Sequence, residues 1–262
     1  MSVASNEAGK AVKKKDGAWE TIKVVIQALL LALIVSTFVF RLFSIPSASM
    51  RVTLLEGDYV FVSKYAYGYS RYSFPFGLAP FDGRIFGHEP TRGDVVVFKL
   101  PSDNRTDYIK RLIGLPGDHI QMIDGVLYIN GEAVQRERIE DQIQYTASGE
   151  PYGVPAYRET LPNGVSYVTL DINPNGFADN TQEFIVPEGH YFMMGDNRDN
   201  SSDSRFAPNY QDPERGGVGY VPFENLIGRA EFIFFSVEDG TRPWMIWKWP
   251  TDVRWDRLFT GL

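Results

Sequence analysis

Lys110 is a residue whose surroundings could give it unusual chemistry. It lies in residues 107–114 (DYIKRLIG), which read as a β-strand, and with a period of two it shares a face with Tyr108 and Leu112. Burial on an apolar face disfavours a charged amine and lowers its pKa, so a neutral amine could take a proton from a serine hydroxyl. The alternative is that Lys110 extends to solvent from an edge strand, beside Arg111. Periodicity leaves both interpretations open.

Ser49 is the matching candidate for a nucleophile. It follows a long apolar segment by only a few residues, within residues 44–50 (SIPSASM), so its hydroxyl would lie near a membrane surface. The alternative is an ordinary polar loop after a membrane span. The three histidines are scattered, at His88, His119 and His190, and none lies in an H-E-x-x-H pair. A general base other than histidine is therefore favoured over a Ser-His-Asp triad.

The sequence predicts no metal or cofactor. It contains no G-x-x-x-x-G-K-[ST] phosphate loop and no cysteine, which excludes disulfides and thiolate ligands. Residues 196–203 (DNRDNSSD) superficially resemble a calcium loop. Arg198 occupies the third position and Ser201 the sixth, where an EF-hand needs an oxygen ligand and glycine. Calcium binding is therefore not expected.

Charge divides the chain into a basic end and an acidic body. The net charge of the 262 residues is −7, which argues against nucleic acid as a partner. Residues 1–23 hold five lysines against three acidic residues, or 5 − 3 = +2, so the remainder carries −7 − 2 = −9. This shift indicates a boundary near residue 23.

A membrane anchor is predicted over residues 22–43. Residues 24–40 carry no charge, and continuing to Phe43 gives about 20 residues, or about 30 Å of helix, which matches a bilayer core. A basic cytoplasmic tail (1–21) and an outer body (44–262) then follow from the positive-inside rule. The alternatives are a cleaved signal peptide, since Ser47-Ala48-Ser49 is a small-x-small site, and a buried core helix.

The body is predicted to be all-β, with antiparallel sheets in a sandwich or barrel-like arrangement. Short apolar runs follow one another between turn signals, and Asp124-Gly125 and Asn130-Gly131 predict tight hairpins that join strands at 119–123, 126–129 and 132–134. Further strands are expected at 58–62, 94–100, 108–113, 183–186, 191–194 and 229–235. Residues 136–180 are interpreted as a smaller inserted β region, either an insertion or a pair of loose hairpins.

The C-terminal tail is rich in tryptophan. Two interpretations stay open: the rings contact the outer leaflet of a membrane, or they pack on the β-body. The residues concerned are Trp244, Trp247, Trp249 and Trp255, interleaved with Arg242, Lys248, Arg254 and Arg257.

Four ordered motifs resemble those of the bacterial type I signal peptidases. They are residues 46–58, which contain PSASM, TLL and GD; residues 92–98 (RGDVVVF); residues 107–118 (DYIKRLIGLPGD); and residues 195–205 (GDNRDNSSDSR). Each motif alone is weak, but the four in this order are specific. The resemblance spans residues 45–205 and leaves the inserted region and the tail uncovered. Some members of the family have a second membrane span before the nucleophile or a disulfide, whereas this chain shows one span and has no cysteine.

The resemblance implies a Ser-Lys dyad that removes signal peptides from exported pre-proteins. Ser49 would attack the scissile carbonyl and Lys110 would be the general base. Ser47 would bind the oxyanion together with the backbone N–H of Ser49, and Ser201 would orient the lysine. Asp203 and Arg205 would be structural supports. Shallow pockets for small residues at −1 and −3 would be lined by Phe43, Ile45, Met50, Leu54, Val97, Tyr108 and Ile109.

The same resemblance implies where the protein works. It would be a single-pass, monomeric protein of a bacterial plasma membrane, with its catalytic body on the outer side and pre-protein signal peptides and the lipid bilayer as partners. The alternative is a membrane-tethered β-domain that binds exported proteins without cleaving them.

Overall fold

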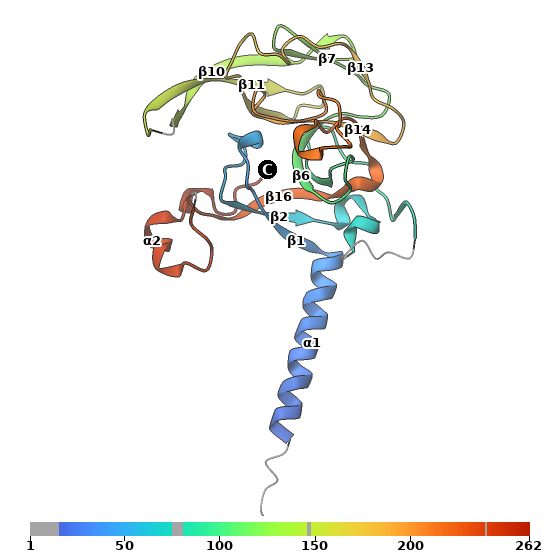
Figure 1. Ribbon diagram of the computed structural model, residues 1–262, viewed down its shortest axis with the longest axis vertical. Coiled ribbons are helices and arrows are strands. Elements are labelled where there is room, and N and C mark those ends of the chain that lie inside the picture. Colours follow the sequence, from blue (N-terminus) through green and yellow to red (C-terminus); the bar gives the residue numbers. More distant parts are fainter. Residues whose placement is uncertain (1–15, 75–80, 146–147, 239) are drawn as a thin grey trace, which may run out of the picture.

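A single long helix leads into a β-rich body (Figure 1). The computed structural model describes residues 16–74, 81–145, 148–238 and 240–262. Most of the predicted basic tail lies outside these ranges. The predicted fold class is confirmed, because the described body is built from antiparallel sheets with little helix.

Helix α1 (Asp16–Phe38) contains a candidate membrane span, Trp19–Phe38, identified by length and composition. Only 6% of this window is buried inside the protein, which argues against the core-helix alternative. The helix was expected to continue to Phe43, but it ends at Phe38 and the chain becomes extended at Phe40. The reason is tertiary: Phe40 to Ser44 pair in register with Ser63 to Tyr59, which overrides the apolar helical signal.

The largest sheet has seven strands, drawn from between residues 40 and 236. Its strand order is β1-β2-β16-β5-β6-β14-β15, and every pair in it is antiparallel. The bounds are β1 Phe40–Ser44, β2 Asp58–Ser63, β5 Val95–Lys99, β6 Asp107–Gly114, β14 His190–Met194, β15 Val221–Pro222 and β16 Leu226–Ser236. Strands β1 and β6 both line one cleft although three strands separate them, so the sheet curls upon itself.

Three smaller sheets complete the body. Their bounds are β3 Tyr69–Ser70 with β4 Arg84–Ile85; β7 His119–Ile123, β8 Val126–Ile129 and β9 Glu132–Ala133 with β13 Phe184–Ile185; and β10 Gln135–Tyr145, β11 Pro151–Thr160 and β12 Ser166–Leu170. The predicted hairpins are confirmed, since Asp124, Gly125, Asn130 and Gly131 all have positive φ.

The inserted region is more regular than expected. Residues 135–170 form the β10-β11-β12 sheet, in which β10 and β11 are among the longest strands of the protein. The β10 strand is mostly exposed, so its sequence shows little apolar alternation. In Figure 1 this sheet lies at the end of the body away from α1. The segment after β1 rises toward it from the seven-stranded sheet.

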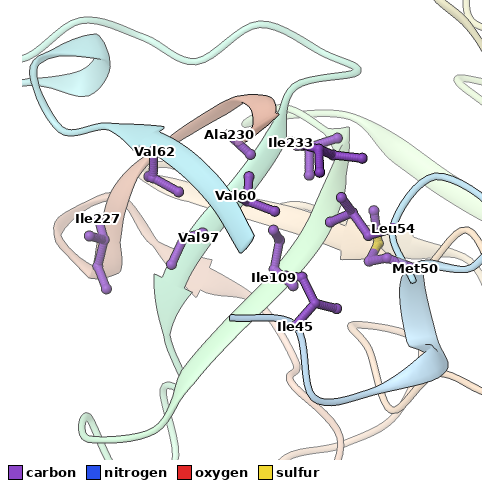
Figure 2. Close-up of a cluster of buried hydrophobic side chains, with 11 residues drawn as sticks. Ile45, Met50, Leu54, Val60, Val62, Val97, Ile109, Ile227, Ala230 and Ile233 are labelled. Carbon is purple, nitrogen blue, oxygen red and sulfur yellow. The ribbon is translucent and has the colours of Figure 1, made fainter. Parts of the chain in front are cut away.

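The hydrophobic core nearest the cleft lies inside the curled sheet. Figure 2 shows side chains from β2, β5, β6 and β16 converging with those of the segment that follows β1. They are Ile45, Met50, Leu54, Val60, Val62, Val95, Val97, Ile109, Ile227, Ala230 and Ile233. This core holds the segment 45–54 against the sheet.

Of the four tryptophans in the tail, one packs on the body and three are largely exposed. Trp249 begins the short helix α2 (Trp249–Asp252), lies 5.2 Å from Phe235 between ring centroids, and donates Nε1–H to Pro243 O. This ring therefore packs on the body. Trp244, Trp247 and Trp255 are 63%, 71% and 58% exposed.

Candidate active site

Ser49 is held at the centre of a tight turn. Residues Ala48–Met50 form a 3-10 turn, η1, which is closed by a hydrogen bond from Arg51 N–H to Ala48 O at 3.1 Å. Met50, the next residue, is completely buried in the core. Because the buried side chain of Met50 directly follows Ser49, it ties the turn to the core and restricts its movement. Ser49 itself is 7% exposed.

Strand β6 places Lys110 beside this turn. Lys110 is paired with Val96 on β5 and is only 3% exposed, so the interpretation that its side chain extends to solvent is wrong. Its Nζ lies 2.5 Å from Ser49 Oγ and 3.1 Å from Ile109 O. The structure therefore brings the two candidate residues into direct hydrogen-bonding contact, although 61 positions separate them in sequence.

The surroundings of Lys110 favour its neutral form. Burial lowers the pKa of its amine from 10.5 to about 8. The carboxylates of Asp203 and Asp196 oppose this shift, and Arg205 adds to it. An amine with this pKa is partly neutral near neutral pH, and its lone pair can then accept the Ser49 proton.

Of the two supporting serines, Ser47 contacts the dyad and Ser201 forms no hydrogen bond with it. Ser47 is exposed, and its Oγ lies 3.4 Å from Ser49 Oγ. Ser201 is 8% exposed, and its Oγ has no hydrogen-bond partner in the described part of the chain. The predicted bond from Ser201 to Lys110 is therefore not formed in this structure, although both residues line the same cleft.

Close packing around Gly195 explains the position of Ser201. A Cβ at residue 195 would collide with Ser201 Oγ and would lie 2.5 Å from both Ser201 Cβ and Ser49 O. Only glycine allows this strand end to approach the nucleophile turn so closely. Sequence reasoning placed Gly195 in a motif but gave it no role, because close approach of backbones is not visible in one sequence.

A buried ion pair connects β6 to the segment that follows β14. Arg111 on β6 contacts Asp196 through Nε at 2.9 Å and Nη2 at 2.7 Å, and Thr53 donates its hydroxyl to Asp196 at 2.5 Å. A second ion pair joins Asp203 to Arg205, and Asp203 Oδ2 also accepts a hydrogen bond from the N–H of Gly195 at 3.0 Å. The roles of Arg111 and Asp196 were missed. Arg111 gave a signal as a charge within the largely apolar run 108–113, whereas Asp196 lies among other polar residues and gave none.

A cleft of about 1060 Å³ opens above the dyad. Both candidate catalytic residues and Ser47 and Ser201 line it, and of the predicted pocket residues it contains Phe43, Ile45, Val97, Tyr108 and Ile109. No group of three potential metal-binding side chains occurs among the residues described.

Met50 and Leu54 were predicted to line this cleft, and for these two residues the prediction is wrong. Both side chains are completely buried and do not reach the cleft. Figure 2 shows them packed together with the core, on the inner side of the segment that carries Ser49. Their apolar character reflects anchoring of the turn, which a single sequence cannot separate from lining of a pocket.

The decisive comparison is at the level of the family. Residues 18–235 match the family described as "Signal peptidase, peptidase S26". The chain belongs to this family. The match begins in α1 and ends at the penultimate residue of β16, so the whole cleft lies within it.

Curated relatives agree with that assignment. Signal peptidase I of Rickettsia typhi is 41% identical over 91% of this chain and 86% of its own length. Signal peptidase I of Rickettsia akari is 45% identical over 79% of this chain and 76% of its own length. A crystal structure of a signal peptidase I from Enterococcus faecalis is 29% identical and covers 54% of this chain and 97% of that one, with a TM-score of 0.31. The chain is therefore a signal peptidase with a candidate N-terminal membrane helix.

Proposed function

We propose that this enzyme removes signal peptides from exported pre-proteins through an acyl-enzyme on Ser49, with Lys110 as general base. The observation that carries the proposal is the 2.5 Å contact between Lys110 Nζ and Ser49 Oγ in a buried position. Neutral Nζ takes the hydroxyl proton while Oγ attacks the scissile carbonyl. The resulting ammonium protonates the leaving amine, and Nζ then activates the water that hydrolyses the ester.

The transition state also needs donors for the oxyanion. Ser47 Oγ, 3.4 Å from Ser49 Oγ, and the backbone N–H of Ser49 are the proposed pair. Donors of this kind are worth about 3–4 kcal/mol each in acyl-transfer enzymes. Both lie on the nucleophile turn itself, so whatever orients that turn also orients the donors.

Ser201 remains the proposed group that orients Lys110. A neutral amine has two N–H groups and one lone pair, and the lone pair faces Ser49. One N–H bonds Ile109 O at 3.1 Å. The second could bond Ser201 Oγ, which is buried and unpaired among the described residues.

Two free strand edges support an extended substrate. Among the described residues, β1 is the outer strand of the sheet and pairs with β2 alone. Residues 107–110 of β6 pair with β5, and the pairing of β6 with β14 begins only at Arg111. A peptide laid in the cleft could add main-chain hydrogen bonds to both edges. The small residues at −1 and −3 are proposed to lie against Phe43, Ile45, Val97, Tyr108 and Ile109, which line the cleft.

The same enzyme would be anchored with residues 1–21 in the cytoplasm and residues 44–262 on the outer side of a bacterial plasma membrane. The lysines that precede α1 support this orientation. The proposed dyad and the cleft are complete within one chain, which supports a monomer.

The proposal is tested by two point variants of the full-length chain in detergent with a purified pre-protein. Ser49→Ala removes the nucleophile and Lys110→Met removes the base, so each should abolish release of mature protein while thermal unfolding stays cooperative. Ser102→Ala and Lys248→Met, which remove the same groups outside the cleft, should cleave like the parent chain. Cleavage by either dyad variant would disprove the mechanism, and binding without any cleavage by the parent would favour the binder alternative.

A further inference from the structure

Asn197 contacts the nucleophile turn at two points. Its backbone N–H donates to Ser49 O at 3.1 Å, and its side-chain Nδ2 donates to Ala48 O at 3.1 Å. The side chain is 1% exposed, so water does not compete for these bonds. Asn197 lies in the motif at 195–205, but nothing in the sequence assigns it a separate task.

These two bonds hold both peptide units that flank Ser49. Ala48 C=O and Ser49 N–H belong to one planar unit, and Ser49 C=O belongs to the next. Fixing the two carbonyls therefore limits both φ and ψ of Ser49, and with them the direction of its side chain. Because N–H and C=O point in opposite directions across a trans peptide, the bond to Ala48 O also aims the Ser49 N–H.

Asn197 is itself held from the far side by the β10-β11-β12 sheet. Asn197 and Leu170, the last residue of β12, form a parallel bridge. Leu170 N–H donates to Asp196 O at 2.9 Å, and Arg198 N–H donates to Leu170 O at 3.0 Å. The neighbouring Arg198 side chain pairs with Glu159 on β11, where both groups are buried. Asn197 is thus fixed on rigid elements rather than on a free loop.

A second contact joins the same sheet to the nucleophile segment. Val52 packs on the cluster formed by Val154, Ala156 and Leu170, and Arg51 donates to Gln144 at 3.4 Å. The segment 48–52 is therefore held by the inserted sheet through Asn197 on one side and Val52 on the other. This arrangement gives the inserted region a function in the site, although it contributes no residue to the cleft.

We propose that Asn197 is a positioning residue that sets the orientation of Ser49 Oγ and of the Ser49 N–H that binds the oxyanion. The inference rests on the proposed function, since it assigns Asn197 to the same acyl-transfer step. It predicts a loss in turnover rather than in substrate binding, because the hydrogen bonds of Asn197 run to Ala48 and Ser49 and not to the strand edges of β1 and β6 that would hold the peptide. A displacement of about 1 Å at a reacting group can cost roughly 100-fold in rate.

The test compares Asn197→Asp, Asn197→Ala and a matched control in the full-length enzyme. Asn197→Asp keeps the shape and the backbone donor but turns the Nδ2 donor into an acceptor facing Ala48 O. Asn225→Asp makes the same change at another buried asparagine, whose Nδ2 donates to Lys99 O at 2.9 Å and to Asn104 Oδ1 at 2.8 Å. Measurements are kcat and KM for a pre-protein, the pH dependence of kcat, and the melting temperature.

The expected result is a fall in kcat of about 10- to 100-fold for both Asn197 variants. KM should stay within about twofold. For Asn197→Ala the pH at which kcat changes should stay the same, because no charge near Lys110 is altered. The carboxylate added in Asn197→Asp should move that pH upward, as Asp196 and Asp203 raise the pKa of Lys110. Asn225→Asp should show a similar drop in melting temperature and a kcat close to that of the parent chain.

Three outcomes would overturn the inference: an unchanged kcat in both Asn197 variants, a loss that appears in KM instead, or an equal loss of kcat in Asn225→Asp. Ser49→Ala, measured alongside, separates the two proposals. If Ser49→Ala abolishes cleavage and the Asn197 variants do not alter kcat, only the positioning role fails. If Ser49→Ala retains activity, the proposed function fails first.

Discussion

At the scale of single residues, the important property of Lys110 is that it is buried with few compensating charges. It is 3% exposed, and its amine contacts one hydroxyl and one carbonyl rather than a carboxylate. Asp196 and Asp203 raise its pKa from a distance, but each is already paired with an arginine. The net result is a base suited to neutral pH.

This burial predicts a definite pH profile. Only neutral Lys110 can accept the serine proton, and its pKa is lowered to about 8. Therefore log(kcat/KM) for a pre-protein should rise with a slope near one as the pH increases toward about 8, and then level off. Initial rates measured from pH 6 to pH 10 would show this. A flat profile across that range, or an inflection that persists in Lys110→Met, would contradict the assignment.

At the scale of elements, the outer strand β1 is the proposed docking edge for the substrate. The residues that flank β1, Val39 and Ile45, bond the β2 side, through Lys64 N–H to Val39 O and Ile45 N–H to Asp58 O. In an antiparallel strand the next residues point their backbone groups the other way, so those of Leu42 and Ser44 face the free edge.

Ser44→Pro would remove one backbone donor from that edge without breaking a bond to β2. We expect KM for an extended peptide to rise by about fivefold to tenfold, the equivalent of one hydrogen bond of about 1 kcal/mol, with a smaller effect on kcat. Ser44→Ala keeps the N–H and is the control. If proline and alanine gave the same KM, the β1 edge would have no part in holding the peptide.

How well sequence predicted an element depended on whether the signal was local. The Asp124-Gly125 and Asn130-Gly131 turns were predictable because their backbone requirement is a property of those residues. The end of α1 at Phe38 was not, since residues 40–44 are apolar enough for a helix and only the pairing with β2 makes them a strand. The regular β10 and β11 were hidden because an exposed strand lacks apolar alternation.

The site showed the same limit. The ordered motifs predicted that Ser49 and Lys110 belong together, and the structure places them in contact. Motifs could not say which apolar neighbours face the cleft, so Met50 and Leu54 were misplaced. The two hydrogen bonds from Asn197 go to the backbone carbonyls of Ala48 and Ser49. The direction of a backbone carbonyl cannot be predicted from a pattern of side chains.

At the scale of the whole molecule, the absence of cysteine makes membrane orientation easy to test. Single cysteines can be placed at Gly17, near the start of α1, and at Phe177, which is 92% exposed on the body. In right-side-out vesicles a membrane-impermeant maleimide should label Phe177→Cys and spare Gly17→Cys, and inside-out vesicles should give the reverse. The opposite pattern would invert the proposed topology.

The junction between α1 and β1 has a consequence for substrate choice. One residue, Val39, separates the end of the candidate span from the strand that borders the cleft, and Tyr69 and Lys64 bind the last helical carbonyls, Phe38 O and Thr37 O. The five residues of β1 extend about 16 Å. Because so little chain separates the helix from β1, the proposed nucleophile Ser49 would lie at a fixed height above the lipid. The enzyme would then select the cleavage site by distance. It would cut a signal peptide only where the scissile bond lies at the same height above the hydrocarbon core of the membrane as Ser49.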